Sequence, residues 1–393
     1  MKVLFLYPNH EGYFRCPVGL TLIMTVVENA GHDVKLFDTT FMNSDDNQDN
    51  SKREEAGLVK PVTLDNYFNK KSTSEIESEW IQFVEDFKPD LIATTIVEDA
   101  YTYAHRLLGL AKSVHDVPVV VGGSMPTVVP RVMIENPNID YLVEGEGEVA
   151  FKELIDALMK DGDVSQVANL WYQENGVTKN TGLVKYLDMD EIPFQKLDFW
   201  DDKHFTKPYD GELRVTGFFE GSRGCMHKCH YCINRAFQVF QEEAGKVRRN
   251  KSPRRIIDEV KAIHKERNFN LIMFTDDNFL GRQPRELDEF FKLWKEEIDL
   301  PYWINTCIET VNDHNLPQLK ASGCVGIAIG LETGSDWVRR NLLLKGKMDN
   351  KFYMEKFALM AKYKIRSTAN NMLGIPGEYE EDFFETIKLN KQI

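Results

Sequence analysis

Short apolar runs alternate with segments of helical spacing along most of this chain, and this alternation constrains the fold more than any other feature. In residues 1–165 the apolar runs are 3–7, 34–37, 90–95, 117–121 and 139–143, and the helical segments are 17–29, 81–87, 103–114 and 148–160. Strands that alternate with helices form a parallel sheet covered on both faces. We therefore predict an α/β, Rossmann-like, doubly wound domain that binds ligands at the carboxyl ends of its strands.

Two stretches depart from this pattern. Residues 43–80 begin with a polar, charged run, which predicts an insertion or a long loop. Residues 166–210 predict a small hairpin and then a linker, because Asn175 and Gly176 form a strong two-residue turn signal.

The alternation resumes in residues 211–393 with five further βα units. The predicted strands are 215–220, 271–274, 302–308, 326–331 and 366–373, and the predicted helices are 254–267, 286–297, 316–322, 350–363 and 380–390. Chemistry in βα barrels takes place at the carboxyl ends of the strands. Polar segments follow all five strands, which predicts a site at that edge: the cysteine loop, then residues 275–278, 305–309, 330–335 and 374–378.

Three closely spaced cysteines, Cys225, Cys229 and Cys232, lie in the segment after the first of these strands. Thiolates are ligands for iron–sulfur clusters and for zinc. Three of them can hold three irons of a 4Fe–4S cluster and leave the fourth iron open to a substrate. A structural zinc site needs a fourth ligand, such as His227 or His230. Free thiols are the third possibility. Disulfides are disfavoured, because three cysteines cannot all pair within the loop and the cell interior is reducing.

The motifs of this second half resemble the radical S-adenosylmethionine (radical SAM) superfamily. The resemblance implies a 4Fe–4S cluster on Cys225, Cys229 and Cys232, which cleaves S-adenosylmethionine to a 5′-deoxyadenosyl radical. It also implies that Tyr231 lies against the adenine, Asp277 binds the methionine amine, Glu332 binds the ribose hydroxyls, and Gly374 and Pro376 border the adenine. Taken singly, Asp276 and Asp277 also fit helix caps and Glu332 a surface acid, while Cys307 and Cys324 fit buried thiols. The family fold is a partial (βα)6 barrel, and this chain shows no sixth strand, so it looks truncated after its fifth βα unit.

The first half resembles the cobalamin-binding domains of cobalamin-dependent radical SAM enzymes, through residues 17–20, 31–34, 120–127 and 144–148. Glycines after a strand allow the backbone to approach a large ligand. The residues expected at the cobalamin are Thr94, Thr95, Gly122, Gly123, Ser124, Thr127, Gly145 and Glu146. The D-x-H-x-x-G motif that supplies histidine to cobalt is absent, and His10 and His105 have different surroundings. We therefore expect no histidine ligand on cobalt; a degenerate domain without cobalamin is the alternative.

Charge and hydropathy exclude several classes of protein. The 48 basic and 62 acidic side chains give a net charge of −14, which argues against a nucleic-acid binder. The basic cluster within residues 246–255 predicts a solvated loop before a helix, or else an anion contact beside the cysteines. No run approaches the roughly 18–20 apolar residues of a membrane span. With no signal peptide and six cysteines, we expect a cytoplasmic protein.

Together the resemblances imply an enzyme that uses cobalamin and S-adenosylmethionine to methylate an unactivated carbon of a small metabolite or peptide. They imply an external one-electron reductant, such as flavodoxin or ferredoxin. Alternatives are a cobalamin-dependent radical cyclisation or rearrangement, a radical SAM enzyme without cobalamin, and, more remotely, a non-catalytic iron–sulfur electron-transfer protein.

Overall fold

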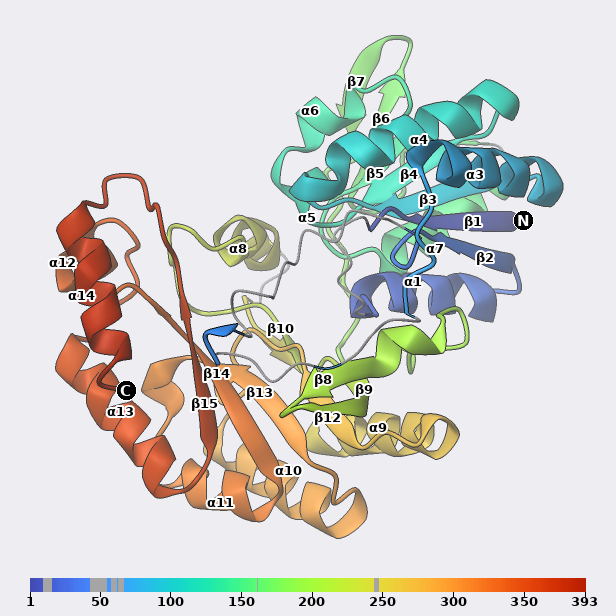
Figure 1. The fold of residues 1–393 in the computed structure, drawn as a ribbon. Helices are drawn as coiled ribbons and strands as arrows, with labels where there is room; N and C mark the ends of the chain where they lie inside the picture. The colour runs from blue at the N-terminus through green and yellow to red at the C-terminus, as the bar shows by residue number, and fades with distance from the viewer. Residues whose placement is uncertain (10–15, 43–54, 58–61, 63–66, 161, 244–246) are drawn as a thin grey trace. The chain divides into compact units, whose positions relative to one another are not determined.

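The computed structural model describes residues 1–393 except 10–15, 43–54, 58–61, 63–66, 161 and 244–246. The chain divides into two compact units, Met1–Arg214 and Val215–Ile393, which are described separately here (Figure 1). Among the helices of the described residues, none combines the length and the apolar character that crossing a membrane requires.

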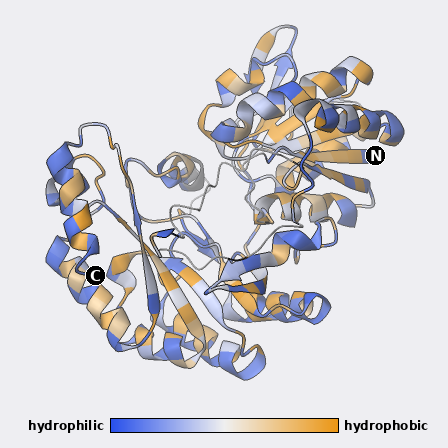
Figure 2. Ribbon diagram, viewed as in Figure 1, coloured by the Kyte–Doolittle hydropathy of each residue, from blue (hydrophilic) through white to orange (hydrophobic). Residues whose placement is uncertain are grey.

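The first unit is built on a seven-stranded sheet in the order β2-β1-β3-β4-β5-β6-β7. The first five strands in this order pair in parallel. Their bounds are β1 Lys2–Tyr7, β2 Asp33–Asp38, β3 Leu91–Thr95, β4 Val119–Gly122 and β5 Tyr141–Val143. Figure 2 shows these central strands as predominantly hydrophobic, as expected for a sheet buried on both faces. The predicted doubly wound α/β architecture is confirmed.

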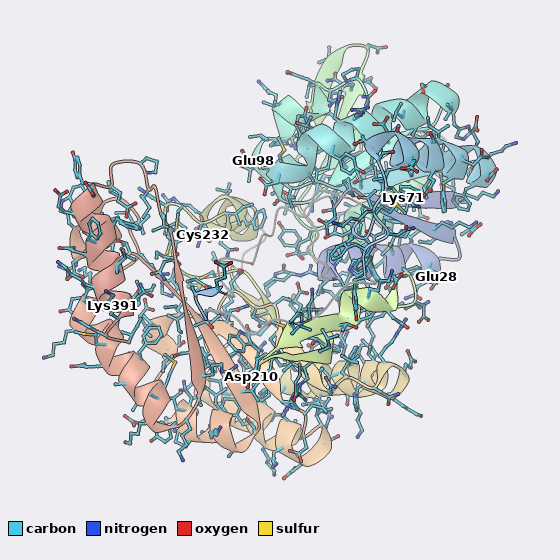
Figure 3. All side chains as sticks on the ribbon, in the orientation of Figure 1. Glu28, Lys71, Glu98, Asp210, Cys232 and Lys391 are labelled. Carbon is cyan, nitrogen blue, oxygen red and sulfur yellow. The ribbon has the colours of Figure 1, made fainter. Side chains whose placement is uncertain are left out.

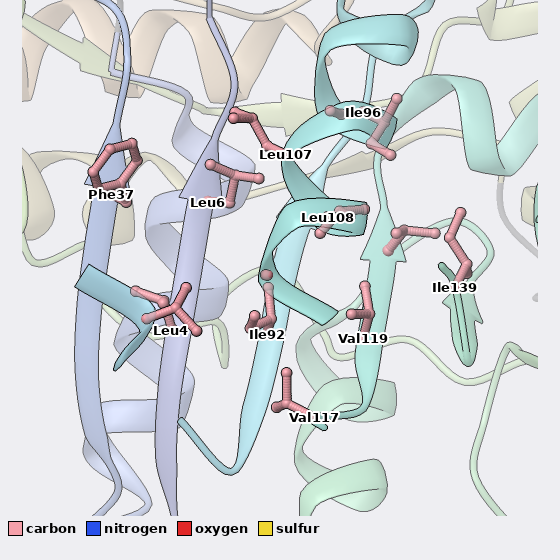
Figure 4. Packing of buried hydrophobic residues seen from close by; sticks show 14 of the residues in the cluster. Leu4, Leu6, Phe37, Ile92, Ile96, Leu107, Leu108, Val117, Val119 and Ile139 are labelled. Carbon is pink, nitrogen blue, oxygen red and sulfur yellow. The ribbon is translucent and has the colours of Figure 1, made fainter. Parts of the chain in front are cut away.

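Helices cover both faces of this sheet. They are α1 (Val18–Asn29), α3 (Thr73–Phe87), α4 (Tyr101–Val114), the short α5 (Ser124–Val128) and α6 (Pro130–Ile134), and α7 (Glu148–Met159). On one face Leu4 and Leu6 of β1 belong to the same buried cluster as Leu107 and Leu108 of α4 (Figure 4). On the other face Phe5 stacks on Phe151 of α7. Successive side chains of β1 therefore point to opposite faces of the sheet, and each face packs against its own layer of helices.

Two segments of the first unit differ from expectation. Helix α3 begins at Thr73, inside the stretch 43–80 that was predicted to be an insertion or loop. Ser72 caps it and Glu75 bonds back to Ser72, a capping box that is visible in the sequence. The predicted hairpin forms as β6 (Leu170–Glu174) and β7 (Val177–Asn180), but it pairs antiparallel with β5 and extends the sheet. Much of residues 43–66 lies outside the described residues.

The second unit contains five βα units around a curved sheet in the order β15-β14-β13-β12-β9-β8. β8 and the first residues of β9 precede Val215 in the chain. The strands are β8 Thr206–Tyr209, β9 Glu212–Phe219, β12 Leu271–Phe274, β13 Tyr302–Thr306, β14 Cys324–Glu332 and β15 Arg366–Asn371. Within this sheet β9, β12, β13, β14 and β15 pair in parallel with one another. β15 has mostly exposed, polar side chains, as Figure 2 also shows.

Five helices follow the five parallel strands in turn: α9 (Pro253–Arg267), α10 (Pro284–Glu297), α11 (Asn315–Ala321), α13 (Asn350–Lys362) and α14 (Glu380–Asn390). Figure 1 shows them along the outer side of the curved sheet. Aromatic rings fill the layer between β12 and α10, where Phe274 packs against Phe290 and Trp294. This packing leaves the carboxyl ends of the strands to carry polar groups.

Smaller elements were not expected from the sequence: the ribbon of β10 (Ser222–Arg223) with β11 (Arg249–Asn250), α8 (Asn234–Glu243) and α12 (Asp336–Asn341). The ribbon also changes the interpretation of the basic cluster. Lys251 is 1% exposed and its Nζ lies 2.8 Å from Glu259 Oε2, so this residue is not in a solvated loop. Arg254 pairs with Glu297 at 2.6 Å. These cations join β11 and α9 to the rest of the unit.

Candidate active site

The cysteine loop begins directly after β9, and a buried acid at the end of β12 anchors it. The Gly221 amide donates to Asp276 Oδ2 at 2.8 Å, and the Ser222 hydroxyl donates to Asp276 Oδ1 at 2.5 Å. Arg282 Nη2 lies 3.4 Å from the same carboxylate, and Asp276 and Arg282 are both buried. Asp276 is therefore an anchor of the loop; the helix-cap alternative does not describe it.

Further hydrogen bonds hold the loop from other directions. Gln238 of α8 donates from Nε2 to the carbonyl oxygens of Cys225 at 2.8 Å and His227 at 2.7 Å. The His230 amide donates to the Leu343 carbonyl at 2.9 Å. Hydrogen bonds with α8 and with Leu343 thus position the backbone of the loop.

The three predicted cysteines lie together in this loop. Cys225 is 7% exposed, Cys229 is 9% exposed and Cys232 is half-buried (Figure 3 marks Cys232). Burial raises the pKa of Cys229 and of Cys232, and each of these thiols also interacts electrostatically with Cys225. A set of three neighbouring thiols fits an iron–sulfur cluster, whose bonding to iron compensates for the cost of ionising buried thiols.

A fourth cysteine lies beside them. Cys307 follows β13, is half-buried, and its thiol pairs with that of Cys225, which lowers the pKa of Cys225. The same pairing, with burial, raises the pKa of Cys307. The interpretation of Cys307 as a buried core thiol is therefore wrong, because the end of β13 faces the cysteine loop. Cys324 is 1% exposed in β14, which confirms that interpretation for this residue.

Tyr231, Glu332 and Lys345 form a hydrogen-bonded group next to the cysteines. The Tyr231 hydroxyl donates to Glu332 Oε1 at 3.0 Å, and Lys345 Nζ lies 3.1 Å from that hydroxyl and 3.4 Å from Glu332 Oε1. Burial and the neighbouring Glu332 carboxylate raise the pKa of Tyr231. Glu332 is 8% exposed, so it is no surface acid.

The backbone of Glu332 adds to its unusual character. Its φ is +69°, a left-handed conformation that non-glycine residues adopt at a cost. The pairing of β14 with β15 is irregular between Gly330 and Glu332. Strained backbone conformations are concentrated at ligand sites, where they direct a side chain toward the ligand.

Asp277 and Cys232 share a hydrogen-bonding partner. Asn234, the first residue of α8, bonds to the Asp277 side chain and also to Cys232. Asp277 is exposed to solvent at the carboxyl end of β12. Partial desolvation raises its pKa, and the charge of Asp276 adds to the effect. A cationic ligand group would relieve this cost.

The segment after β15 forms a tight turn. Gly374 and Gly377 have φ of +75° and +90°. Glu378 accepts the amides of Gly374 at 2.9 Å and Ile375 at 3.1 Å, which holds the turn from within. Pro376 is exposed at its tip. Nothing lies within 4 Å of a Cβ built on Gly374, so the backbone is open to a ligand there.

In the first unit, Gly122 ends β4 and Gly123 follows it, and this glycine loop is closely packed. Gly123 has φ +103° and ψ −169°, a conformation nearly confined to glycine. A Cβ built there would lie 2.5 Å from Thr95 Oγ1 and 2.9 Å from the Ile96 backbone. The Thr127 hydroxyl donates to the Gly123 carbonyl at 2.8 Å and accepts the Gly145 amide at 3.0 Å. Thr95, Thr127 and Gly145 therefore shape the loops after β3, β4 and β5 at one edge of the sheet.

The remaining predicted cobalamin residues lie at the same edge. Gly122 ends β4, Ser124 begins α5, and the half-buried Glu146 follows β5. Thr94 is 4% exposed and donates to the Thr95 carbonyl at 3.4 Å. Of the two histidines considered for cobalt, His105 lies on α4, 3.3 Å from Asn138 Nδ2. His10 lies outside the described residues.

Two contributors to the site, Gln238 and Lys345, were missed at the sequence level. Asp276 and Cys307 lie in the predicted strand-end segments, but their contacts with the cysteine loop were not predicted. Asp276 carried a signal, since it precedes Asp277 at the end of a strand. Gln238 and Lys345 gave none, because their partners lie in segments without periodicity. Cys307 looked apolar because it follows a buried strand.

Two family models match the chain. Residues 219–389 match the model described as "Radical SAM superfamily", and residues 63–155 match the model described as "B12 binding domain". The B12-binding domain thus precedes the radical SAM domain in the chain. The prediction of a cobalamin-binding region followed by a radical SAM region is therefore confirmed.

The relatives agree with this prediction. "Uncharacterized methyltransferase PH0819" of Pyrococcus horikoshii is 27% identical over 408 residues, which cover 100% of this chain and 78% of that protein. Cytidylyl-2-hydroxyethylphosphonate methyltransferase of Streptomyces wedmorensis is 25% identical over 88% of this chain and 67% of its own length. The solved structure of the radical S-adenosylmethionine methyltransferase TsrM from Kitasatospora setae superposes with a TM-score of 0.71 at 17% identity, covering 99% of this chain and 70% of that one. That similarity supports the fold.

Proposed function

We propose that this protein is a methyltransferase that uses a 4Fe–4S cluster, S-adenosylmethionine and cobalamin to methylate an unactivated carbon of a small metabolite or peptide. The observation that carries the proposal is the convergence of Cys225, Cys229 and Cys232 with the Tyr231–Glu332–Lys345 group in one unit. The second carrier is the glycine loop of a matched B12-binding domain in the other unit. When bound, the cluster supplies the electron that cleaves the sulfonium and cobalamin supplies the methyl group.

In this proposal the residues of the second unit bind and orient the nucleotide. Cys225, Cys229 and Cys232 hold the cluster. Glu332 accepts the two ribose hydroxyls, and its strained backbone aims the carboxylate toward them. The open backbone at Gly374 and the ring of Tyr231 border the adenine.

Asp277 receives the methionine ammonium. Its carboxylate is partly desolvated, so a cation that binds there gains more than it would from a fully hydrated acid. Asn234 fixes the carboxylate next to Cys232, which places the amine beside the cluster ligands.

The first unit holds cobalamin against the loops after β3, β4 and β5. Gly122 and Gly123 allow close backbone approach, and the hydroxyls of Thr95 and Ser124 offer polar contacts at that edge. The hydroxyl of Thr127 is engaged by Gly123 and Gly145, so it acts by shaping the cradle. Thr94 and Glu146 support the same loops.

The proposal is tested with methyl-deuterated S-adenosylmethionine. Enzyme reconstituted anaerobically with cluster and cobalamin should first transfer the labelled methyl group to cobalamin. When pools of candidate substrates are added, the label should then appear on a carbon atom of one substrate, as detected by mass spectrometry. A one-electron donor such as flavodoxin or ferredoxin completes the mixture. A product that is cyclised or rearranged and carries no label would favour the alternative reaction class.

A further inference from the structure

Cys307 has no part in the function proposed above, yet it lies against one of the cluster cysteines. Within the described residues, Cys225, His227 and Cys307 form a group whose ligand atoms all lie within 4.8 Å of one another. Cys229 and Cys232 are not members of this group. A cluster binds its thiolates through separate irons, so its cysteines need not converge on a point. A single ion does require such convergence.

Hydrogen bonds from neighbouring residues hold the backbones of all three residues. Gln238 binds the carbonyl oxygens of Cys225 and His227. The Cys307 amide donates to Asn278 Oδ1 at 3.2 Å, and its carbonyl accepts the Thr310 hydroxyl at 2.6 Å. A fixed backbone leaves only side-chain rotations to be lost when an ion binds, which favours affinity.

The donor set matches a borderline-soft divalent cation. Two thiolates and one imidazole, with a fourth position left open, are a known ligand set for Zn²⁺. Ligand atoms of a tetrahedral zinc site are about 3.5–3.8 Å apart, given bond lengths of roughly 2.0–2.3 Å. The upper limit of 4.8 Å in the group exceeds that value by about 1 Å, so the side chains must draw together when an ion binds. Glu309 Oε1 lies 4.0 Å from His227 Nδ1, beyond hydrogen-bond distance, and adds a negative charge beside the imidazole ring.

We propose that Cys225, His227 and Cys307 form a site for one borderline-soft divalent cation, such as Zn²⁺, in the chain without its cluster. Two thiol protons are released as the cation binds, and no electron is transferred. Because Cys225 belongs to both ligand sets, this ion and the cluster exclude each other. The competition between the ion and the cluster rests on the proposed function, because it requires that a cluster binds Cys225. The ion site itself does not rest on that function.

The test uses Co²⁺ as a spectroscopic probe on the reduced, full-length, cluster-free chain under anaerobic conditions. We expect one Co²⁺ per chain, with thiolate-to-cobalt absorption in the near ultraviolet and tetrahedral ligand-field bands in the visible. One equivalent of Zn²⁺ should displace it. Cys307→Ala should weaken Co²⁺ binding by about 10-fold or more, since even the loss of an outer-shell partner costs that much.

Cys229→Ala is the matched control, because it removes a thiol from the same loop but not from the proposed group. It should leave Co²⁺ affinity within about twofold, as should Cys324→Ala, which removes a thiol buried in β14. Far-ultraviolet circular dichroism checks that each variant is folded. If Cys307→Ala does not fold, Cys307→Ser replaces it in the same measurements. The reverse pattern, with Cys229→Ala weakening binding and Cys307→Ala not, would overturn the proposal, as would wild-type protein that binds no Co²⁺.

Iron analysis separates this proposal from the function it accompanies. After reconstitution, Cys307→Ala should still assemble the cluster and Cys229→Ala should not, and one equivalent of Zn²⁺ added beforehand should slow assembly in wild type but not in Cys307→Ala. Wild-type protein that binds Co²⁺ as expected but never assembles a cluster would contradict the proposed function and leave the ion site standing.

Discussion

Glu332 combines three properties that rarely occur together: burial, a left-handed backbone and bonds to both a tyrosine and a lysine. A carboxylate this buried needs partners, and Lys345 supplies the compensating charge. Lys345 also lies over the ring of Tyr231, 5.8 Å from its centroid. Glu332, Tyr231 and Lys345 therefore hold one another in place through direct contacts.

At this scale, Glu332→Ala should weaken S-adenosylmethionine binding by roughly 1–3 kcal/mol, the usual cost of losing a hydrogen bond to a charged group. Isothermal titration calorimetry of the reconstituted protein measures the change. Asp288→Asn, which alters an exposed acid paired with His314, is the control and should bind normally. Unchanged affinity in a folded Glu332→Ala protein would remove Glu332 from the site.

Two adjacent acids after β12 have different roles, although they look equivalent in the sequence. Asp276 is buried between the cysteine loop and Arg282, whereas Asp277 faces the cysteines through Asn234. Successive residues leaving a strand point in opposite directions, which accounts for the division. Sequence reasoning located the pair but could not assign the anchor.

Asp276→Asn should therefore lower the free energy of unfolding by about 3 kcal/mol, because it leaves Arg282 buried without an opposing charge. Asp277→Asn should leave folding stability unchanged or slightly higher, since it removes a desolvated charge, while weakening S-adenosylmethionine binding. Urea unfolding of the cluster-free chain measures both. Equal stability losses in the two variants would refute this division of roles.

The glycine loop gives a second test at the level of elements. Gly123→Ala should destabilise the first unit by about 1–3 kcal/mol from backbone strain, with a similar further amount from the contact with Thr95. Gly31→Ala is the matched control, because Gly31 also has a positive φ of +87° but nothing within 4 Å of a built Cβ. Denaturant unfolding should show the larger loss for Gly123→Ala; equal losses would mean that the loop opens to admit the methyl group.

Much of the molecule could be predicted from its periodicity. The central strands and helices have strong apolar patterns, and their order alone implies the doubly wound sheet and the βα units. Elements without such patterns were missed: β10 and β11 are two residues each, and α12 is a single short helix. Contacts such as Cys225 with Cys307 join residues 82 apart, and no local pattern encodes them.

For the molecule as a whole, the expectation on cobalt ligation remains a prediction. Imidazole ligates cobalt only when a partner places it, and His105 lies on a helix beside Asn138. We therefore expect base-off cobalamin with no protein histidine on the metal. Electron paramagnetic resonance of the Co(II) form reports this, since an axial nitrogen would split each cobalt line into three. Such splitting from a protein imidazole would contradict the prediction.

The central claim is that three cysteines in the second unit support cleavage of S-adenosylmethionine. The most direct test is to reconstitute the protein anaerobically, add S-adenosylmethionine and a one-electron reductant, and quantify 5′-deoxyadenosine alongside iron and sulfide. We predict about four irons and four sulfides per chain, with 5′-deoxyadenosine formed by the wild type and lost when Cys225, Cys229 and Cys232 are replaced by alanine. Stoichiometric zinc without charge-transfer absorption, and no 5′-deoxyadenosine, would contradict the account.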